Sequence, residues 1–251
     1  MNPFEKPELM DAKRVLAIQP HYDDNDIAAG GTIATLAENG TQIYYLTVTN
    51  DIVGVIDTAL SDEAAQIQLR SEQEQAGEII GVKEHYWLNY PDAGQYDYFE
   101  LRKQIIMHIR VIKPDFIITC DPWNPYEAHN DHIQSGKAAA EAAILFGLPR
   151  ISTSPQIDED FNQKPSDLTG VAFYATSNPN TIFDISNTKV KKHAAIEKYT
   201  AQFNENDLRM LLLFLEHKEQ ECARDKPFSH GEPLKVLRGF HLHGYPDAIT
   251  T

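Results

Sequence analysis

A chain of 251 residues with an apolar content of 42% can bury one substantial core, so we expect a single domain over residues 1–251. The formal net charge of −15 argues against binding to nucleic acid, because contact with a phosphate backbone requires clustered cations. Two cysteines are too few for a disulfide framework, and no apolar run reaches the roughly 20 residues of a membrane span, so we expect a cytoplasmic protein.

Strands and helices alternate along the first part of the chain, over about residues 14–147. Strands are expected at 15–19, 43–48, 84–88 and 116–120, and helices at 26–38, 61–80, 99–112 and 131–146, with Asp26, Ser61 and Asp131 as N-caps. This order predicts an α/β fold with a doubly wound, mostly parallel sheet and helices on both faces. The carboxyl ends of parallel strands meet at one edge, so the loops that follow the strands should line one rim.

The pattern weakens after residue 148. Residues 152–169 are polar and rich in Pro, Asp and Gln, which favours a long loop or lid. Further strands are expected at 171–176 and 181–185, and helices at 186–199 and 207–224. We expect these segments to elaborate the same domain.

Potential metal ligands and proton carriers follow two of the expected strands. His21, Asp23 and Asp24 come directly after the first strand, and His129 and His132 follow the fourth. Catalytic zinc sites commonly use three ligands drawn from His, Asp and Glu and leave a position for water. We therefore expect His21, Asp24 and His132 to bind one metal ion. Asp23 is then available as a general base, and His129 can stabilise an oxyanion or protonate a leaving amine.

Other interpretations of these residues stay open. Taken alone, the acidic turn also fits a helix cap, because Asp and Asn favour both turns and caps. A non-catalytic α/β protein that binds a nucleotide or sugar would use the same fold. A metal-dependent phosphoesterase would use vicinal aspartates, although two histidine ligands favour zinc-like metals over hard cations.

The motifs themselves resemble those of the LmbE-like or PIG-L family of zinc-dependent de-N-acetylases. Members typically carry His-Pro-Asp-Asp after the first strand and a His-x-x-His or His-Pro-Asp-His element later. This chain has Tyr22 where Pro is usual and Asn25 where Glu is frequent. Gly30-Gly31 and the sequence His129-Asn130-Asp131-His132 complete the resemblance.

The resemblance extends to an Arg-containing helix and a Pro-Asp turn. By that similarity, Arg70 and Asp92 would contact the substrate or support the metal loop. Asp131 can cap its helix, orient His129 by hydrogen bonding, or do both. The resemblance implies a Rossmann-like fold, one Zn²⁺ per chain and removal of an N-acetyl group from an amino sugar or its conjugate. It also implies a homo-oligomer, either a trimer or a hexamer.

Several aromatic and histidine residues are candidates for the rim of the site. Trp123 and Tyr126 flank the second motif, where they can stack on a sugar or simply pack. His241 and His243 come late in the chain, where related sugar deacetylases can place a residue at the pocket rim.

Overall fold

The protein is described by a computed structural model over residues 5–244 and 246–251. Its centre is a seven-stranded sheet with the strand order β3-β2-β1-β4-β5-β7-β6. The strands are β1 (Arg14–Gln19), β2 (Gln42–Thr49), β3 (Val82–Tyr90), β4 (Phe116–Cys120), β5 (Gly170–Tyr174), β6 (Thr181–Asp184) and β7 (Gly231–Leu237). The pairs from β3 to β5 are parallel, whereas β7 runs antiparallel to both β5 and β6. The predicted mostly parallel sheet is confirmed.

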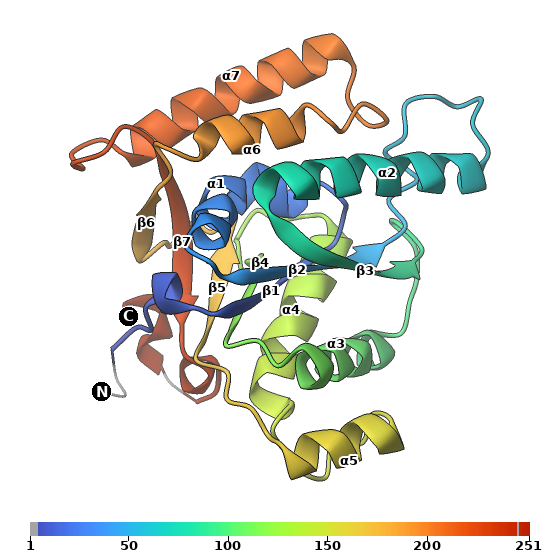
Figure 1. The fold of residues 1–251 in the computed structure, drawn as a ribbon, viewed down its shortest axis with the longest axis vertical. Coiled ribbons are helices and arrows are strands. Elements are labelled where there is room, and N and C mark those ends of the chain that lie inside the picture. The colour runs from blue at the N-terminus through green and yellow to red at the C-terminus, as the bar shows by residue number, and fades with distance from the viewer. Residues whose placement is uncertain (1–4, 245) are drawn as a thin grey trace.

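Helices cover both faces of this sheet, as predicted (Figure 1). The helices are α1 (Asp24–Glu38), α2 (Asp62–Ile80), α3 (Tyr98–Ile112), α4 (Asn130–Leu145), α5 (Pro155–Gln163), α6 (Lys189–Ile196) and α7 (Glu205–Cys222). Figure 1 shows α1, α2, α6 and α7 on one side and α3, α4 and α5 on the other. Short 3-10 helices lie at Leu9–Asp11, Gly239–Leu242 and Pro246–Ile249.

Alternation along the buried strands divides the core into two layers. In β1, Val15 and Ala17 belong to the layer under α1, and Leu16 and Ile18 belong to the layer over α3 and α4. A strand buried on both faces lacks charge along its length, which explains the wholly apolar run before the acidic turn.

The ends of α2 follow from local sequence signals. The Ser61 hydroxyl accepts a hydrogen bond from the backbone N–H of Ala64 and caps the first turn. Gly81 ends the helix with φ 98°, a left-handed conformation that favours glycine. The predicted start and end of this helix are confirmed, whereas the last two helices start at Lys189 and Glu205 rather than at the expected positions 186 and 207.

The segment 152–169 is not one long loop, and that prediction is wrong for Pro155–Gln163, which forms α5. Proline fits the first turn of a helix because its missing N–H is not needed there. Phe161 is buried against Phe146, and Asp158 forms an ion pair with Arg110 of α3. Arg110 lies in the last turn of α3, which leads into the start of β4. This end of β4 is at the edge of the sheet opposite to the strand carboxyl ends. The helix therefore does not form the expected lid.

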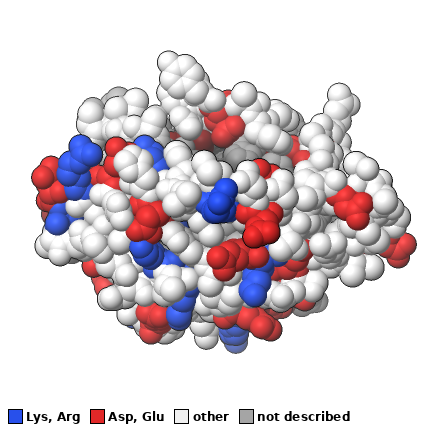
Figure 2. All heavy atoms as spheres, turned by 90° about the horizontal axis from the view of Figure 1, so that it is seen from above, with Lys and Arg blue, Asp and Glu red and all other residues white. Residues whose placement is uncertain are grey.

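Basic and acidic side chains are mixed over the left and centre of the face formed by α2, α6 and α7 (Figure 2). Figure 2 shows this face from above, with basic side chains interspersed among acidic ones. Across the described ranges, no helix is both long and apolar enough to cross a bilayer.

Candidate metal centre and surrounding loops

The acidic turn connects β1 to α1 at the carboxyl edge of the sheet. His21 and Asp23 are buried there, and Asp24 is the first residue of α1. Asp26 was expected to cap this helix, but that prediction is wrong. Its buried carboxylate instead accepts hydrogen bonds from the hydroxyls of Tyr45 (2.6 Å) and Tyr199 (2.5 Å).

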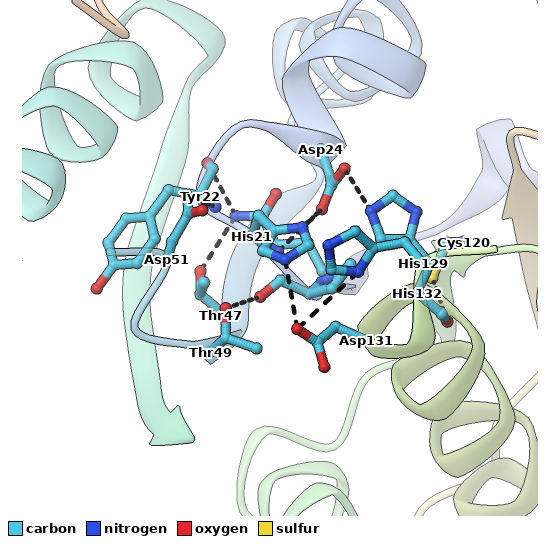
Figure 3. Close-up of polar contacts among 12 residues, drawn as sticks. His21, Tyr22, Asp24, Thr47, Thr49, Asp51, Cys120, His129, Asp131 and His132 are labelled. Atoms are coloured by element: carbon cyan, nitrogen blue, oxygen red, sulfur yellow. Dashed lines mark hydrogen bonds and ion pairs between the residues drawn. The ribbon is translucent and has the colours of Figure 1, made fainter. Parts of the chain in front are cut away.

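The three predicted metal ligands converge at this edge. His21 Nδ1 lies 3.2 Å from Asp24 Oδ2, and His132 Nε2 lies 3.4 Å from Asp24 Oδ1. Figure 3 shows both imidazoles turned toward Asp24, one from the turn after β1 and the other from α4. Ligand atoms of a tetrahedral site with bonds of 2.0–2.1 Å are separated by about 3.3 Å, so this donor set fits a divalent ion.

A second set of side chains surrounds the other nitrogen of His21. His21 Nε2 lies 3.3 Å from Asp92 Oδ1 and 3.6 Å from Asp131 Oδ2. His129 Nδ1 lies 4.0 Å from the same Asp131 oxygen, and its ring meets the His21 ring edge-on at 4.7 Å. Four residues of this set, His21, Asp92, His129 and Asp131, are also close enough to hold an ion.

Asp131 does not cap α4, and that part of the prediction is wrong. The N-cap is His129, and the fully buried Asp131 carboxylate turns toward His21. It accepts hydrogen bonds from the backbone N–H of Ala93 (2.9 Å) and the hydroxyl of Tyr96 (3.0 Å). Asp131 thus connects α4 to the Pro-Asp turn.

The carboxylates of the site have opposite pKa shifts. Burial raises the pKa of Asp23 well above its usual value, and the negative charges of Asp24 and Asp51 add to this. Burial would also raise the pKa of Asp24, but hydrogen bonding to His21 and the charge of His132 outweigh it and lower the pKa. Asp51 is buried, which raises its pKa to about 7. In the turn, Asp23 thus holds a proton readily, and the adjacent Asp24 does not.

Proton affinity is also high at His21. Burial would lower the pKa of this imidazole, but hydrogen bonds to Asp131, Asp24 and Asp92 outweigh burial and raise it. The carboxylates on both sides of the ring therefore favour a positive charge on His21.

The Tyr22 peptide is fixed by residues that the sequence did not reveal. Its N–H donates to Asp51 Oδ2 (3.0 Å), and its carbonyl accepts from Gln73 Nε2 (2.9 Å) and the Tyr199 hydroxyl (3.0 Å). Proline, which is usual here in the resembled family, has no N–H for the bond to Asp51. Tyr22 therefore provides a backbone contact that Pro would lack.

The remaining candidates lie around the converging side chains rather than among them. Arg70 Nη2 donates to Asn89 Oδ1 (2.6 Å), and the guanidinium lies 5.0 Å from the Trp87 ring centre. Trp123 is 54% exposed and meets Phe173 edge-on at 5.5 Å, whereas Tyr126 is 96% exposed. Both aromatics belong to the loop that leads from β4 to α4.

The two late histidines differ in environment. His241 is buried and lines a cavity of about 500 Å³ together with Trp123 and Phe173. Its Nδ1 accepts a hydrogen bond from the backbone N–H of Arg238. His243 is exposed. The structure thus brings His241, but not His243, into a cavity shared with a candidate rim residue.

Comparisons with known proteins show the family of the chain. Residues 16–143 match the family model described as PIG-L: GlcNAc-PI de-N-acetylase. The chain is 32% identical over 238 residues to a diacetylchitobiose deacetylase from Thermococcus kodakarensis, which covers 95% of this chain and 88% of that protein. It is 27% identical over 164 residues to a 1D-myo-inositol 2-acetamido-2-deoxy-alpha-D-glucopyranoside deacetylase from Kineococcus radiotolerans. That match covers 53% of this chain and 45% of that protein.

A solved structure extends the similarity to the whole fold. The N,N'-diacetylchitobiose deacetylase from Pyrococcus horikoshii, complexed with its inhibitor MPG, superposes with a TM-score of 0.86 at 33% identity. The match covers 98% of this chain and 90% of that chain.

Proposed function

Because the chain belongs to the PIG-L family of de-N-acetylases, whose members are hydrolases, we propose that it removes the N-acetyl group from an amino sugar or its conjugate. The observation that carries the proposal is the convergence of His21, Asp24 and His132 from two distant loops at one edge of the sheet. Two of the similar proteins are named for substrates that carry an acetylated amino group on a sugar, which supports this substrate class.

His21, Asp24 and His132 would hold the metal ion, as predicted from their spacing. The family is metal-dependent, and two imidazoles with one carboxylate favour Zn²⁺ over hard cations. Both oxygens of Asp131 accept hydrogen bonds, from the Ala93 N–H and the Tyr96 hydroxyl, whereas the His21 N–H donates to Asp24 at Oδ2 and leaves Oδ1 facing His132. We therefore place the ion at Asp24 and assign the second set to orienting His21 through Nε2.

Asp23 is the proposed general base. When bound, a divalent cation acidifies water, polarises an acyl oxygen and favours the ionised form of nearby carboxyls. Asp23 in that form takes the proton of the attacking water. The Tyr22 peptide, held on both sides, keeps the adjacent Asp23 in place for this transfer.

His129 is the proposed partner of Asp23 in catalysis. Its ring lies beside His21 and His132, with centroid separations of 4.7 and 5.2 Å. From this position it would stabilise the developing oxyanion or protonate the leaving nitrogen. The products are acetate and a free amine.

Arg70, Trp123 and Tyr126 are the proposed contacts for the sugar. Arg70 supplies charged donors for hydroxyl or glycosidic oxygens, and the two exposed rings supply stacking faces. A cytoplasmic location and a trimeric or hexameric assembly stay predictions, and light scattering after size exclusion would measure the assembly.

The decisive experiment compares Asp23→Asn with the wild-type protein. The variant should keep one equivalent of metal while acetate release falls by roughly 10²- to 10⁴-fold, the usual contribution of a general base. Asp160→Asn, which changes an exposed carboxylate on α5, is the matched control and should retain full activity. Substrates should include an N,N'-diacetylated disaccharide and a phosphate monoester. Full activity of Asp23→Asn would exclude the assigned base, and phosphate release without acetate release would favour the phosphoesterase.

A further inference from the structure

We infer that Glu127 is a positioning residue that orients the metal ligand His132. The inference deepens the proposed function and rests on it, because it concerns the same metal centre. Glu127 lies in the loop between β4 and α4, two residues before the N-cap of that helix.

One carboxylate makes two separate contacts in this loop. Glu127 Oε2 lies 3.2 Å from His132 Nδ1, and Glu127 Oε1 accepts a hydrogen bond from the backbone N–H of His129 (2.7 Å). The side chains of Glu127 and His132 are each only 20% exposed, so water competes weakly for these contacts. Each oxygen therefore serves one of the two histidines in the motif.

The contact at Nδ1 decides which nitrogen of His132 faces the metal position. The negative Glu127 carboxylate, 3.2 Å away, favours a proton on Nδ1, which leaves the lone pair of Nε2 directed toward the Asp24 side. Without Glu127, the neutral ring can place its proton on Nε2 and donate it to Asp24 Oδ1, which lies 3.4 Å away. That arrangement would block two ligand atoms at once. Glu127 thus prevents the two proposed ligands from pairing with each other.

The same arrangement recurs at the other imidazole of the centre. His21 Nδ1 faces Asp24, and His21 Nε2 faces Asp92 and Asp131. Both histidines therefore carry a carboxylate at the nitrogen that points away from Asp24. Carboxylates in this position typically change metal affinity by 10- to 100-fold when they are mutated.

A purely structural role for Glu127 predicts a different outcome. The carboxylate also holds the N–H of His129, the N-cap of α4, and lies near the positive end of that helix. If this were its only role, mutation would lower the stability of the protein and leave the intrinsic metal affinity of the folded protein unchanged.

Glu127→Gln separates the two roles, because glutamine offers one acceptor oxygen where glutamate offers two. The amide can still accept the His129 N–H, but it carries no negative charge to favour the proton on His132 Nδ1. Glu159→Gln is the matched control, since it neutralises an exposed glutamate on α5. For each metal-free protein, a chromophoric chelator competition gives the Zn²⁺ dissociation constant, and thermal unfolding gives the melting temperature.

We expect Glu127→Gln to bind Zn²⁺ 10- to 100-fold more weakly while its metal-free melting temperature stays near that of the wild type. The spectrum of the Co²⁺-substituted protein should also shift in Glu127→Gln and not in Glu159→Gln. Unchanged Zn²⁺ affinity, or a loss of folding in both Glu127→Gln and Glu127→Asp, would overturn the positioning role. A wild-type protein that binds no metal would instead refute the proposed function, so the two failures are distinguishable.

Discussion

The side-chain amide of Gln73 donates a hydrogen bond to the carbonyl of Tyr22 at 2.9 Å, directly before Asp23 in the chain. Gln73 is fully buried on α2, and its Oε1 accepts the indole N–H of Trp87 at 2.7 Å. The amide therefore connects an aromatic ring beside Arg70 to the backbone that carries the proposed base.

Replacement of Gln73 by Met should lower both stability and turnover. Met fills similar space but leaves the Trp87 N–H without its partner, so we expect the free energy of unfolding to fall by about 1–3 kcal/mol. A displaced Asp23 should reduce kcat by roughly 10- to 100-fold. Gln75→Met, on the exposed side of the same helix, is the control for helix propensity. Urea denaturation and acetate release measure the two effects, and a variant with normal kcat would show that the bond does not position Asp23.

Arg70 should affect substrate binding without affecting the metal. Its guanidinium contacts Asn89 and the face of Trp87. Loss of a charged hydrogen-bond donor to substrate costs about 1.5–3 kcal/mol, so Arg70→Met should raise KM by roughly 10- to 100-fold. Arg209→Met removes an exposed guanidinium on α7 and should leave KM unchanged. Steady-state kinetics with metal analysis tests this, and loss of metal from Arg70→Met would assign Arg70 to the metal loop instead.

The proximity of His21 and His132 in the fold could be predicted from the sequence, although 111 positions separate the two residues. Both residues follow runs that read as buried parallel strands, and β1 and β4 do pair in parallel. Parallel pairing brings the ends of both strands to the same edge, so a short-range pattern determined a long-range contact. The helix caps were less predictable, because Asp26 and Asp131 have cap-forming side chains that the tertiary structure uses for buried contacts.

The residues that hold the Tyr22 peptide could not be predicted in this way. Asp51 and Tyr199 act through contacts 29 and 177 positions away, and no local pattern encodes those distances. Gln73 did carry a signal, because it lies on the same helix face as the buried Leu69 and Ala76, where an apolar residue is expected. A polar residue on a buried face requires a partner, and here that partner belongs to the site.

Acidification should weaken the protein through His85. Burial lowers the pKa of this imidazole to about 4, and its ring is stacked on Trp87 and lies edge-on to Tyr45. The unfolded chain binds a proton near pH 6.5, whereas the folded protein binds it only near pH 4. The contribution of His85 to the free energy of unfolding is therefore complete above pH 6.5. It is lost as the pH falls toward 4, at up to about 1.4 kcal/mol per pH unit.

Comparison with His85→Gln isolates this contribution, because glutamine does not titrate. The difference in unfolding free energy between wild type and variant should shrink as the pH falls from 6.5 to 4.5. His217→Gln, which changes an exposed histidine on α7, is the control for replacing an imidazole. Urea denaturation at a series of pH values gives these curves. Parallel curves for wild type and His85→Gln would mean that His85 titrates normally in the folded protein.

Loss of the Lys192 ammonium should lower the stability of the protein more than loss of an exposed ion pair. Its ammonium lies 2.7 Å from Glu219 and 2.8 Å from Glu232, and all three side chains are at most 3% exposed. Lys192→Met leaves Glu232 buried without a cation and leaves Glu219 with His193 as its partner, so we expect a loss of about 3–5 kcal/mol in unfolding free energy. The loss should diminish as the pH falls, because protonation removes the uncompensated charge. Lys191→Met breaks an exposed pair with Glu38 and should cost at most about 1 kcal/mol. Equal costs for the two variants in urea denaturation would contradict the distinction between buried and exposed pairs.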